Sequence, residues 1–378
     1  MRSDILCDIS GLNVSGNLIN LRAVRLTPPG RGAVACVLVD GHGAIDVVQA
    51  LVRTRSGRPL ADFAEDRLVV GHFNAENGEE VVVRRHNPTT VELHCHGGYT
   101  AATMIEETLR QRGCRFVTWQ EWAADNQDDP IAAAALVALA DAPTQRTASI
   151  LLDQYHGALR RAFDAIQKDI DQKNFAAARK RVEALLAYIP LGIHLTKPWK
   201  VVVAGPPNAG KSSLINALVG FQRSIVHHTP GTTRDAVTVA TAMDGWPVEL
   251  CDTAGLCAEV QGIEKAGVEL ARKTISKADL TVLIFDLTTK WSAADQLLFE
   301  EFPNTLLVHN KVDLTISEDN RPEGLYTSAL TGTGIDMLIE KIADQLAPVP
   351  SPIGAAVPFT LEHIQRVQEF AGILQEII

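Results

Sequence analysis

The chain has 378 residues, of which 46% are hydrophobic and 21% are charged. This length can bury two or three hydrophobic cores, and the composition is that of a globular protein. The net charge of −10 argues against a protein that holds nucleic acid by bulk electrostatics, although a local basic patch stays open. The six cysteines show no CxxC pair and no framework spacing, so we expect reduced thiols in a cytoplasmic protein.

Signals for secretion or membrane insertion are not evident. Asp4 and Asp8 stand where a signal peptide needs its apolar core. The longest apolar run, Ile131–Ala140, is too short to span a bilayer. We therefore expect no membrane partner.

The first part of the chain, residues 1–118, mixes strand-like segments, at 33–39, 81–83 and 91–93, with one helix-like segment at 101–112. Helix is predicted to dominate from Pro130 to Ile189. Apolar residues at steps of three or four predict a single stripe there, which is typical of a core or partner-helix surface. Its members are Leu152, Tyr155, Leu159, Phe163, Ile166 and Ile170, and Asn174 is expected to break the run.

From Lys200 to Leu346 strands and helices alternate, which predicts a mostly parallel sheet wrapped by helices. Asp244-Gly245 is a hairpin-turn signal within this region. A Pro/Ala-rich linker and one amphipathic helix beginning near Leu361 follow. The predicted fold is an α/β P-loop domain (197–349) inserted in an α-helical domain (119–196 and 350–378), preceded by an α+β domain (1–118).

Residues 205–213 read Gly-Pro-Pro-Asn-Ala-Gly-Lys-Ser-Ser and match G-x-x-x-x-G-K-[ST] between a strand and a helix. Backbone N–H groups of such a loop wrap phosphates, the lysine reaches the β- and γ-phosphates, and the first serine binds Mg²⁺. The motif alone also fits a glycine-rich turn without a ligand. The residues assigned to the nucleotide are Asn208, Ala209, Gly210, Lys211, Ser212 and Ser213.

Four further motifs follow in order, each of the last three after a predicted strand. Gly231–Asp235 is where a switch threonine would complete the Mg²⁺ shell. In Asp252–Gly255, Asp252 would hold Mg²⁺ through water and the Gly255 N–H would meet the γ-phosphate.

The last two motifs predict the base. Asn310-Lys311-Val312-Asp313 places a carboxylate where it can accept hydrogen bonds from the guanine N1–H and exocyclic amine, a donor pair that adenine lacks. The stem of Lys311 would pack on the base. A backbone N–H of Ser328-Ala329-Leu330 would meet the guanine O6. Five motifs in this order predict a Mg²⁺-dependent GTP site.

Hydrolysis is a separate question. In Ras-like proteins the residue after the DxxG glycine is a glutamine that orients the attacking water. Here that residue is Leu256, which cannot hydrogen-bond through its side chain. The site is therefore slow, or another group orients the water; a bound monovalent cation could supply positive charge beside the phosphates.

With these motifs in place, the chain resembles the tRNA modification GTPases (the MnmE/TrmE family). Residues 27–34, Thr-Pro-Pro-Gly-Arg-Gly-Ala-Val, resemble the family's opening signature, and residues 92–98 resemble its E-[IL]-H-C-H-G-G segment. The resemblance covers nearly the whole chain and is densest over 200–335. It implies a folate-binding, dimerising first domain and a G domain inserted in a helical domain.

The resemblance also implies a mechanism. G domains of this family carry a hydrophobic residue at the position of Leu256 and dimerise in the presence of K⁺. The family's water-orienting glutamate falls on Glu264, its K⁺ ligand on Asn208 and its Mg²⁺ threonine on Thr233, with Thr232 in the K⁺ loop. A surface carboxylate in the first turn of a helix is the alternative interpretation of Glu264.

The sequence departs from the family pattern mainly at the residues that would bind the one-carbon donor. Leu38 stands where the family holds 5-formyl-tetrahydrofolate with an arginine, and the segment with its folate-contacting lysine has no counterpart. Glu92 is the folate contact that is retained. Because one glutamate cannot replace the family's cationic contacts to the folate diacid, folate binding is doubtful, whereas the GTPase motifs are intact. The family's Cys-x-Gly-Lys ending also has no counterpart before Ile378.

Two interpretations follow. By resemblance the protein is a homodimeric GTPase that modifies the wobble uridine of tRNA with an MnmG-like flavoprotein. The alternative is a GTP-switched dimerising scaffold without modification chemistry. His94-Cys95-His96 suggests a metal site, and on a strand both histidines would share one face while Cys95 faces away. The family resemblance implies instead that the triplet is a structural segment before Gly97-Gly98.

Overall fold

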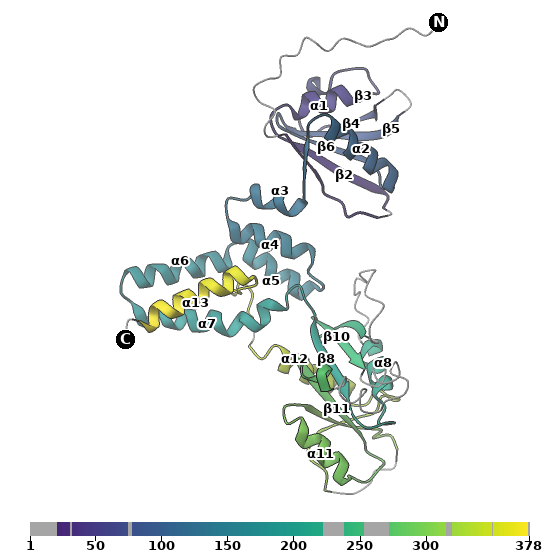
Figure 1. Cartoon of the computed structure of the whole chain (residues 1–378), viewed down its shortest axis with the longest axis vertical. Coiled ribbons are helices and arrows are strands. Elements are labelled where there is room, and N and C mark those ends of the chain that lie inside the picture. The colour runs from purple at the N-terminus through teal and green to yellow at the C-terminus, as the bar shows by residue number, and fades with distance from the viewer. Residues whose placement is uncertain are drawn as a thin grey trace. The chain divides into compact units, whose positions relative to one another are not determined.

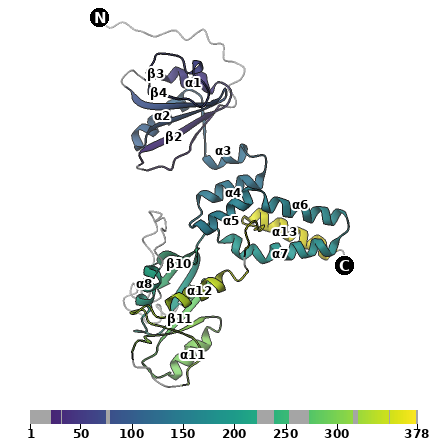
Figure 2. The same cartoon turned by 180° about the vertical axis from the view of Figure 1, so that it is seen from behind.

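The computed structural model describes residues 21–30, 32–74, 78–221, 238–252, 272–314, 320–349 and 351–376. Figures 1 and 2 show its elements from two opposite sides. Contacts divide the chain into two compact units, Met1–Asp128 and Asp129–Ile378. The domain boundaries predicted from the sequence at 118/119, 196/197 and 349/350 stay predictions.

The first unit is built on a seven-stranded sheet in the order β3-β4-β5-β6-β2-β1-β7. Its strands are β1 (Arg22–Arg25), β2 (Val34–Asp40), β3 (Val52–Thr54), β4 (Leu68–Phe73), β5 (Glu79–Asn87), β6 (Thr90–His96) and β7 (Arg115–Val117). All neighbouring strands are antiparallel except β1 and β7. The helices are α1 (Ala44–Leu51), α2 (Tyr99–Gln111), α3 (Trp119–Asp125) and the 3₁₀ turn η2 (Leu60–Asp62). The strands and the helix predicted here are confirmed.

Alternation along β2 separates the two faces of this sheet. Ala35, Val37 and Val39 point into the main core of the unit, which α1 and α2 also enter. Cys36 and Leu38 therefore lie on the second face. Val24 and Val117 share that face with Leu38, and the tryptophans of α3 pack against them.

Helices α4 (Pro130–Ala140), α5 (Gln145–Tyr155), α6 (Ala158–Asp171), α7 (Phe175–Ile193) and α13 (Leu361–Gln375) begin and end the second unit. Side-chain caps mark the starts of α4 and α5: Asp129 accepts from the N–H of Ile131 with a proline at the first helical position, and Thr144 forms a capping box. Asn174 precedes α7, as predicted. Helix α13 packs on α6 and α7 through Phe370 and its neighbours (Figure 1).

The single apolar stripe predicted over 152–170 is wrong in one respect. Gly157 adopts a left-handed conformation, with φ 85°, and ends the run, so that α5 and α6 are separate helices. Leu152 is 42% exposed, whereas Leu159, Phe163 and Ile166 are buried together. The helical period continues through the break, which is why periodicity alone does not reveal it.

Between α7 and α13 the chain forms a six-stranded sheet in the order β13-β12-β11-β8-β10-β9. Its strands are β8 (Trp199–Ala204), β9 (Thr238–Met243), β10 (Trp246–Asp252), β11 (Leu280–Asp286), β12 (Leu306–Asn310) and β13 (Leu325–Thr327). Every pair is parallel except β9 with β10. Asp244 and Gly245 both have positive φ, 46° and 77°, which confirms the predicted hairpin turn.

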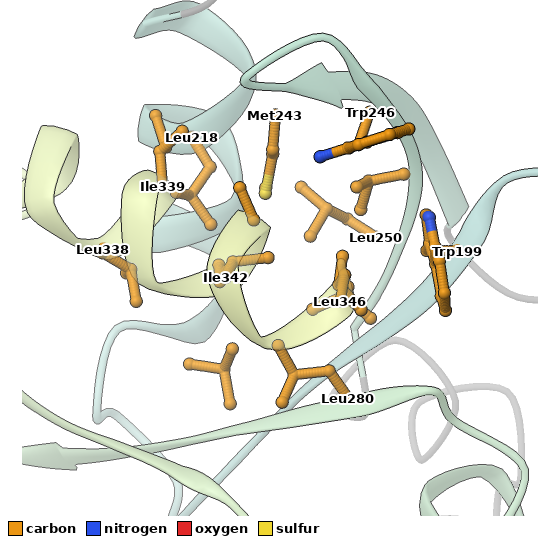
Figure 3. Close-up of a cluster of buried hydrophobic side chains, with 14 of the residues drawn as sticks. Trp199, Leu218, Met243, Trp246, Leu250, Leu280, Leu338, Ile339, Ile342 and Leu346 are labelled. Atoms are coloured by element: carbon orange, nitrogen blue, oxygen red, sulfur yellow. The ribbon is translucent and has the colours of Figure 1, made fainter. Parts of the chain in front are cut away.

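Helices α8 (Lys211–Phe221), α11 (Ala293–Glu301) and α12 (Ile335–Leu346) accompany this sheet. Figure 3 shows residues of α12 packing with Trp199, Met243 and Leu250 of the strands. Ile150 of α5 belongs to the same hydrophobic cluster. The helical and α/β parts of the second unit thus share a core.

Within the described ranges, we find no helix that is both long and apolar enough to cross a membrane.

Candidate nucleotide site

The phosphate loop connects the end of β8 to the start of α8, beside the point where β8 has β10 on one side and β11 on the other. Such a switch point is where open α/β sheets bind ligands. Gly205 has φ 149°, and a Cβ there would lie 2.1 Å from the carbonyl oxygen of Ile284. Gly210 has φ 95°, and its Cβ would lie 2.4 Å from Nδ2 of Asn310. The two motif glycines are therefore required by backbone conformation and close packing, and the loop fits a phosphate cradle.

Lys211 and Ser212 begin α8, where N–H groups and the helix dipole favour an anion. The buried ammonium of Lys211 donates to the carbonyl oxygens of Gly205, at 2.9 Å, and Pro206, at 2.8 Å. Ser212 Oγ donates to Asp252 Oδ2 at 2.6 Å. Asp252 ends β10, beside Val203 of β8, so that parallel pairing brings the two predicted Mg²⁺-binding oxygens together. An oxygen pair of this kind is what Mg²⁺ prefers.

Asn310 ends β12 and is 2% exposed. Its Nδ2 donates to the Ala209 carbonyl at 3.0 Å, and its Oδ1 accepts from the N–H of Ala329 at 3.1 Å and from Thr327 Oγ1 at 3.3 Å. One side chain thus joins the phosphate loop to the Ser328-Ala329 loop. Ser328 is buried, and its Oγ accepts from the N–H of Thr331.

Lys311 has φ 72°, and its side chain is partly exposed. Its Nζ donates to Asp286 Oδ2 at 2.6 Å. Burial opposes ionisation of Asp286, yet hydrogen bonds from Lys311 and Thr288 together hold the pKa of its carboxyl below the usual value. The Asp313 side chain is exposed, as a carboxylate that receives a base would be.

Sequence reasoning does not single out Asp286 and Thr327, although each ends a strand of the sheet. The signal that could find Asp286 is its place at the carboxyl end of the apolar run 280–285, level with the phosphate loop. The predicted residues Thr232, Thr233, Gly255, Leu256 and Glu264 lie outside the described residues.

A cavity of about 230 Å³ lies against the phosphate loop. Asn208 and Ala209 line it on the side of the loop, and Asp286, Thr289 and Trp291 line it on the side of β11 and the segment that follows. Asn208 is exposed and has φ 63°. Asp286, which lines this cavity, also pairs with Lys311 of the guanine motif. The cavity therefore belongs to the nucleotide region.

On the second face of the first sheet, Leu38 is 5% exposed and packs with Val24 and Val117. Trp119 and Trp122 of α3 pack against these three side chains. An apolar cluster therefore occupies the position at which the resemblance would have placed a folate-binding arginine.

The sheet order, the phosphate loop and the guanine motif define a P-loop GTPase, an enzyme that hydrolyses GTP. The sequence profile of the 50S ribosome-binding GTPases matches residues 200–311. A tRNA modification GTPase MnmE of Prochlorococcus marinus is 30% identical over 92% of this chain and 85% of its own length. The chain belongs to this MnmE family of tRNA modification GTPases.

The MnmE of Moorella thermoacetica is 29% identical over 85% of this chain and 81% of its own length. Among solved structures, the G domain of the T. maritima FeoB iron transporter is 27% identical over 39% of this chain and 98% of its own, with a TM-score of 0.28.

Proposed function

We propose that this GTPase hydrolyses GTP with K⁺ and Mg²⁺ as cofactors, in a homodimer whose G domains associate when GTP and K⁺ are bound. Ser212 and Thr233 hold Mg²⁺ directly and Asp252 holds it through water, which shields charge on the β- and γ-phosphates. Lys211 stabilises the charge that develops on the transferred phosphoryl group. Glu264 orients the attacking water, because Leu256 cannot do so.

The observation that carries the K⁺ proposal is the combination of Leu256 in the sequence with Asn208 in the phosphate loop. An apolar residue at the Ras glutamine position leaves the water and the transition-state charge to other groups. The exposed side chain of Asn208 offers an amide oxygen, a hard ligand suited to K⁺, at the mouth of the loop. A fixed cation there would act where charge develops.

Steady-state GTP hydrolysis in K⁺ and in Na⁺ at equal ionic strength tests this proposal. We expect a higher rate in K⁺, a loss of that difference in Asn208→Ala, and a large fall in kcat with retained GTP binding in Glu264→Ala. Glu340→Ala, an exposed carboxylate on α12, is the matched control and should keep wild-type turnover. Equal rates in the two cations, or full activity in Glu264→Ala, would defeat the proposal.

We further propose that hydrolysis serves modification of the tRNA wobble uridine with an MnmG-like flavoprotein in the cytoplasm, as family membership implies. The apolar cluster around Leu38 favours the second candidate, a GTP-switched dimerising scaffold, because a folate diacid needs cations. Calorimetric titration of the purified protein with 5-formyl-tetrahydrofolate separates the two. Binding supports modification in its folate-dependent form, and no detectable binding supports the scaffold.

A further inference from the structure

Four side chains with metal-ligating atoms meet on the second face of the first sheet. They are Cys36 of β2, His86 of β5, and Glu92 and His94 of β6. The donor atoms of Cys36, Glu92 and His94 all lie within 4.8 Å of one another. This group is called the Cys36 cluster below.

Strand register explains why these residues converge. Cys36 lies directly opposite His94 in the antiparallel pair of β2 and β6. Glu92 is two residues before His94 on the same strand and so shares its face. His86 reaches the group from β5, at a register shift between Arg85 and Asn87, and a bulge of this kind redirects side chains.

Glu92 is the centre of the Cys36 cluster. The Cys36 thiol donates to Glu92 Oε1 at 2.9 Å, and Nε2 of His94 lies 3.6 Å from the same oxygen. Nε2 of His86 contacts the other carboxylate oxygen, Oε2, at 2.8 Å. Arg84 approaches Oε2 only to 4.0 Å and is engaged by Asp66 at 3.0 Å, so it does not replace the histidines as the partner of Glu92.

We propose that the Cys36 cluster binds one borderline-soft divalent cation, of the class of Zn²⁺, through the sulfur of Cys36, the carboxylate of Glu92 and the imidazole of His94, with His86 as a fourth ligand or as the group that orients the carboxylate. One sulfur, one oxygen and imidazole nitrogens form a donor set that Zn²⁺ accepts in tetrahedral geometry. The thiol of Cys36 loses its proton on binding. Thiolate and carboxylate together then balance the charge of the ion.

The distances and the exposure suit this ion. With Zn–N near 2.0 Å and Zn–S near 2.3 Å, the ligand atoms of one sulfur and several nitrogens around a tetrahedral Zn²⁺ lie about 3.3 to 3.5 Å apart, so the donor atoms need only small movements. Cys36 is buried, whereas the side chains of His86 and His94 are 30% and 29% exposed, which leaves a path from solvent. Mg²⁺ and K⁺ prefer oxygen ligands, so the Cys36 cluster selects a different ion from the GTPase site.

The test uses the full-length protein, freed of metal with a chelator and titrated with Co²⁺ and then Zn²⁺. Co²⁺ bound by a thiolate gives a sulfur-to-metal charge-transfer band in the near ultraviolet, which reports on the cysteine ligand itself. The variants are Cys36→Ala and His94→Gln. Their matched controls are Cys95→Ala, whose thiol lies on the opposite face in the core, and His96→Gln, whose exposed ring pairs with Glu79.

We expect about one Co²⁺ per chain with the charge-transfer band, displaced by Zn²⁺. The band should vanish in Cys36→Ala, and Zn²⁺ affinity should fall at least about tenfold in His94→Gln, while both controls resemble the wild type. If Cys36→Ala fails to fold, His94→Gln decides alone. The same band and affinity in Cys36→Ala, unchanged affinity in His94→Gln, or no binding by the wild type would overturn the proposal and leave the proposed GTPase mechanism untouched.

Discussion

Nδ2 of Asn310 donates a hydrogen bond to the main-chain carbonyl of Ala209 at 3.0 Å, which ties the guanine motif to the phosphate loop across 101 positions of sequence. The other end of the same amide accepts from the Ala329 N–H. Base recognition and phosphate binding therefore share one buried side chain. The nucleotide site is held together by this contact as well as by its individual motifs.

We predict that Asn310→Ala weakens binding of GTP and GDP together. Removing the amide leaves the Ala209 carbonyl and the Ala329 N–H without this partner, and a lost buried hydrogen bond of this kind costs about 1–3 kcal/mol. The dissociation constant measured with a fluorescent guanine nucleotide should rise about tenfold or more. Asn304→Ala, an exposed asparagine before β12, should bind normally. Unchanged affinity in Asn310→Ala would show that the loops are positioned independently.

A second prediction concerns the base. Asp313→Asn replaces an acceptor carboxylate by an amide that can also donate, and xanthine carries a carbonyl where guanine carries its exocyclic amine. We expect affinity for GTP to fall at least about a hundredfold, or about 3 kcal/mol, and affinity for xanthosine triphosphate to rise. Competition binding with both nucleotides measures the switch. Asp336→Asn, an exposed residue in the first turn of α12, should leave the preference for GTP intact.

Local patterns in the sequence are sufficient to predict the strands and the order of the nucleotide motifs, because a P-loop or an Asn-Lys-x-Asp segment is defined by contiguous residues. Contacts between motifs cannot be predicted in the same way. The pairing of Lys311 with Asp286 and of Asn310 with Ala209 depends on which strands are neighbours in the sheet. The mutual support of the motifs therefore becomes visible only in the fold.

Strand register explains why the sequence alone does not predict the Cys36 cluster. The alternation of His94-Cys95-His96 predicts their faces correctly: Cys95 is in the core, and His94 is partly exposed. It gives no sign that Cys36 lies opposite His94, because the pairing of β2 with β6 joins residues far apart in sequence. The triplet by itself suggests a metal site and the family resemblance argues against one. The structure places Cys36 and His86, from two other strands, beside Glu92 and His94.

A third prediction uses two glycines at opposite ends of one segment. Gly210→Ala forces a Cβ to within 2.4 Å of Nδ2 of Asn310 at a residue with φ 95°, so we expect nucleotide binding to be lost. Gly220→Ala, in the last turns of α8, places its methyl group in open space. That variant should bind GTP normally and raise the free energy of unfolding by about 0.5–1 kcal/mol. Equal nucleotide binding by the two variants would contradict the packing described for the loop.

The last prediction is a pH dependence of stability in the second unit. His363 of α13 is 6% exposed, with the rings of Phe359 and Phe163 edge-on to it at centroid distances of 4.6 and 6.4 Å. Burial lowers the pKa of His363 to about 4; Asp129 opposes this shift and Arg366 adds to it. The unfolded chain, with a histidine pKa near 6.5, binds the proton more tightly than the folded protein. The stability that depends on neutral His363 is therefore fully present above about pH 6.5, and it is lost as the pH drops toward 4.

The size of this effect follows from the shift, at about 1.4 kcal/mol per pKa unit, and reaches about 3 kcal/mol at the acid end. Urea unfolding followed by circular dichroism at about pH 7.5 and about pH 5 measures it. His363→Leu cannot take up the proton, so its unfolding midpoint should fall less between the two pH values than that of the wild type. His156→Gln, which removes an exposed histidine after α5, should retain the wild-type dependence. Parallel pH profiles for His363→Leu and the wild type would show that His363 is protonated in the folded protein as readily as in the unfolded chain.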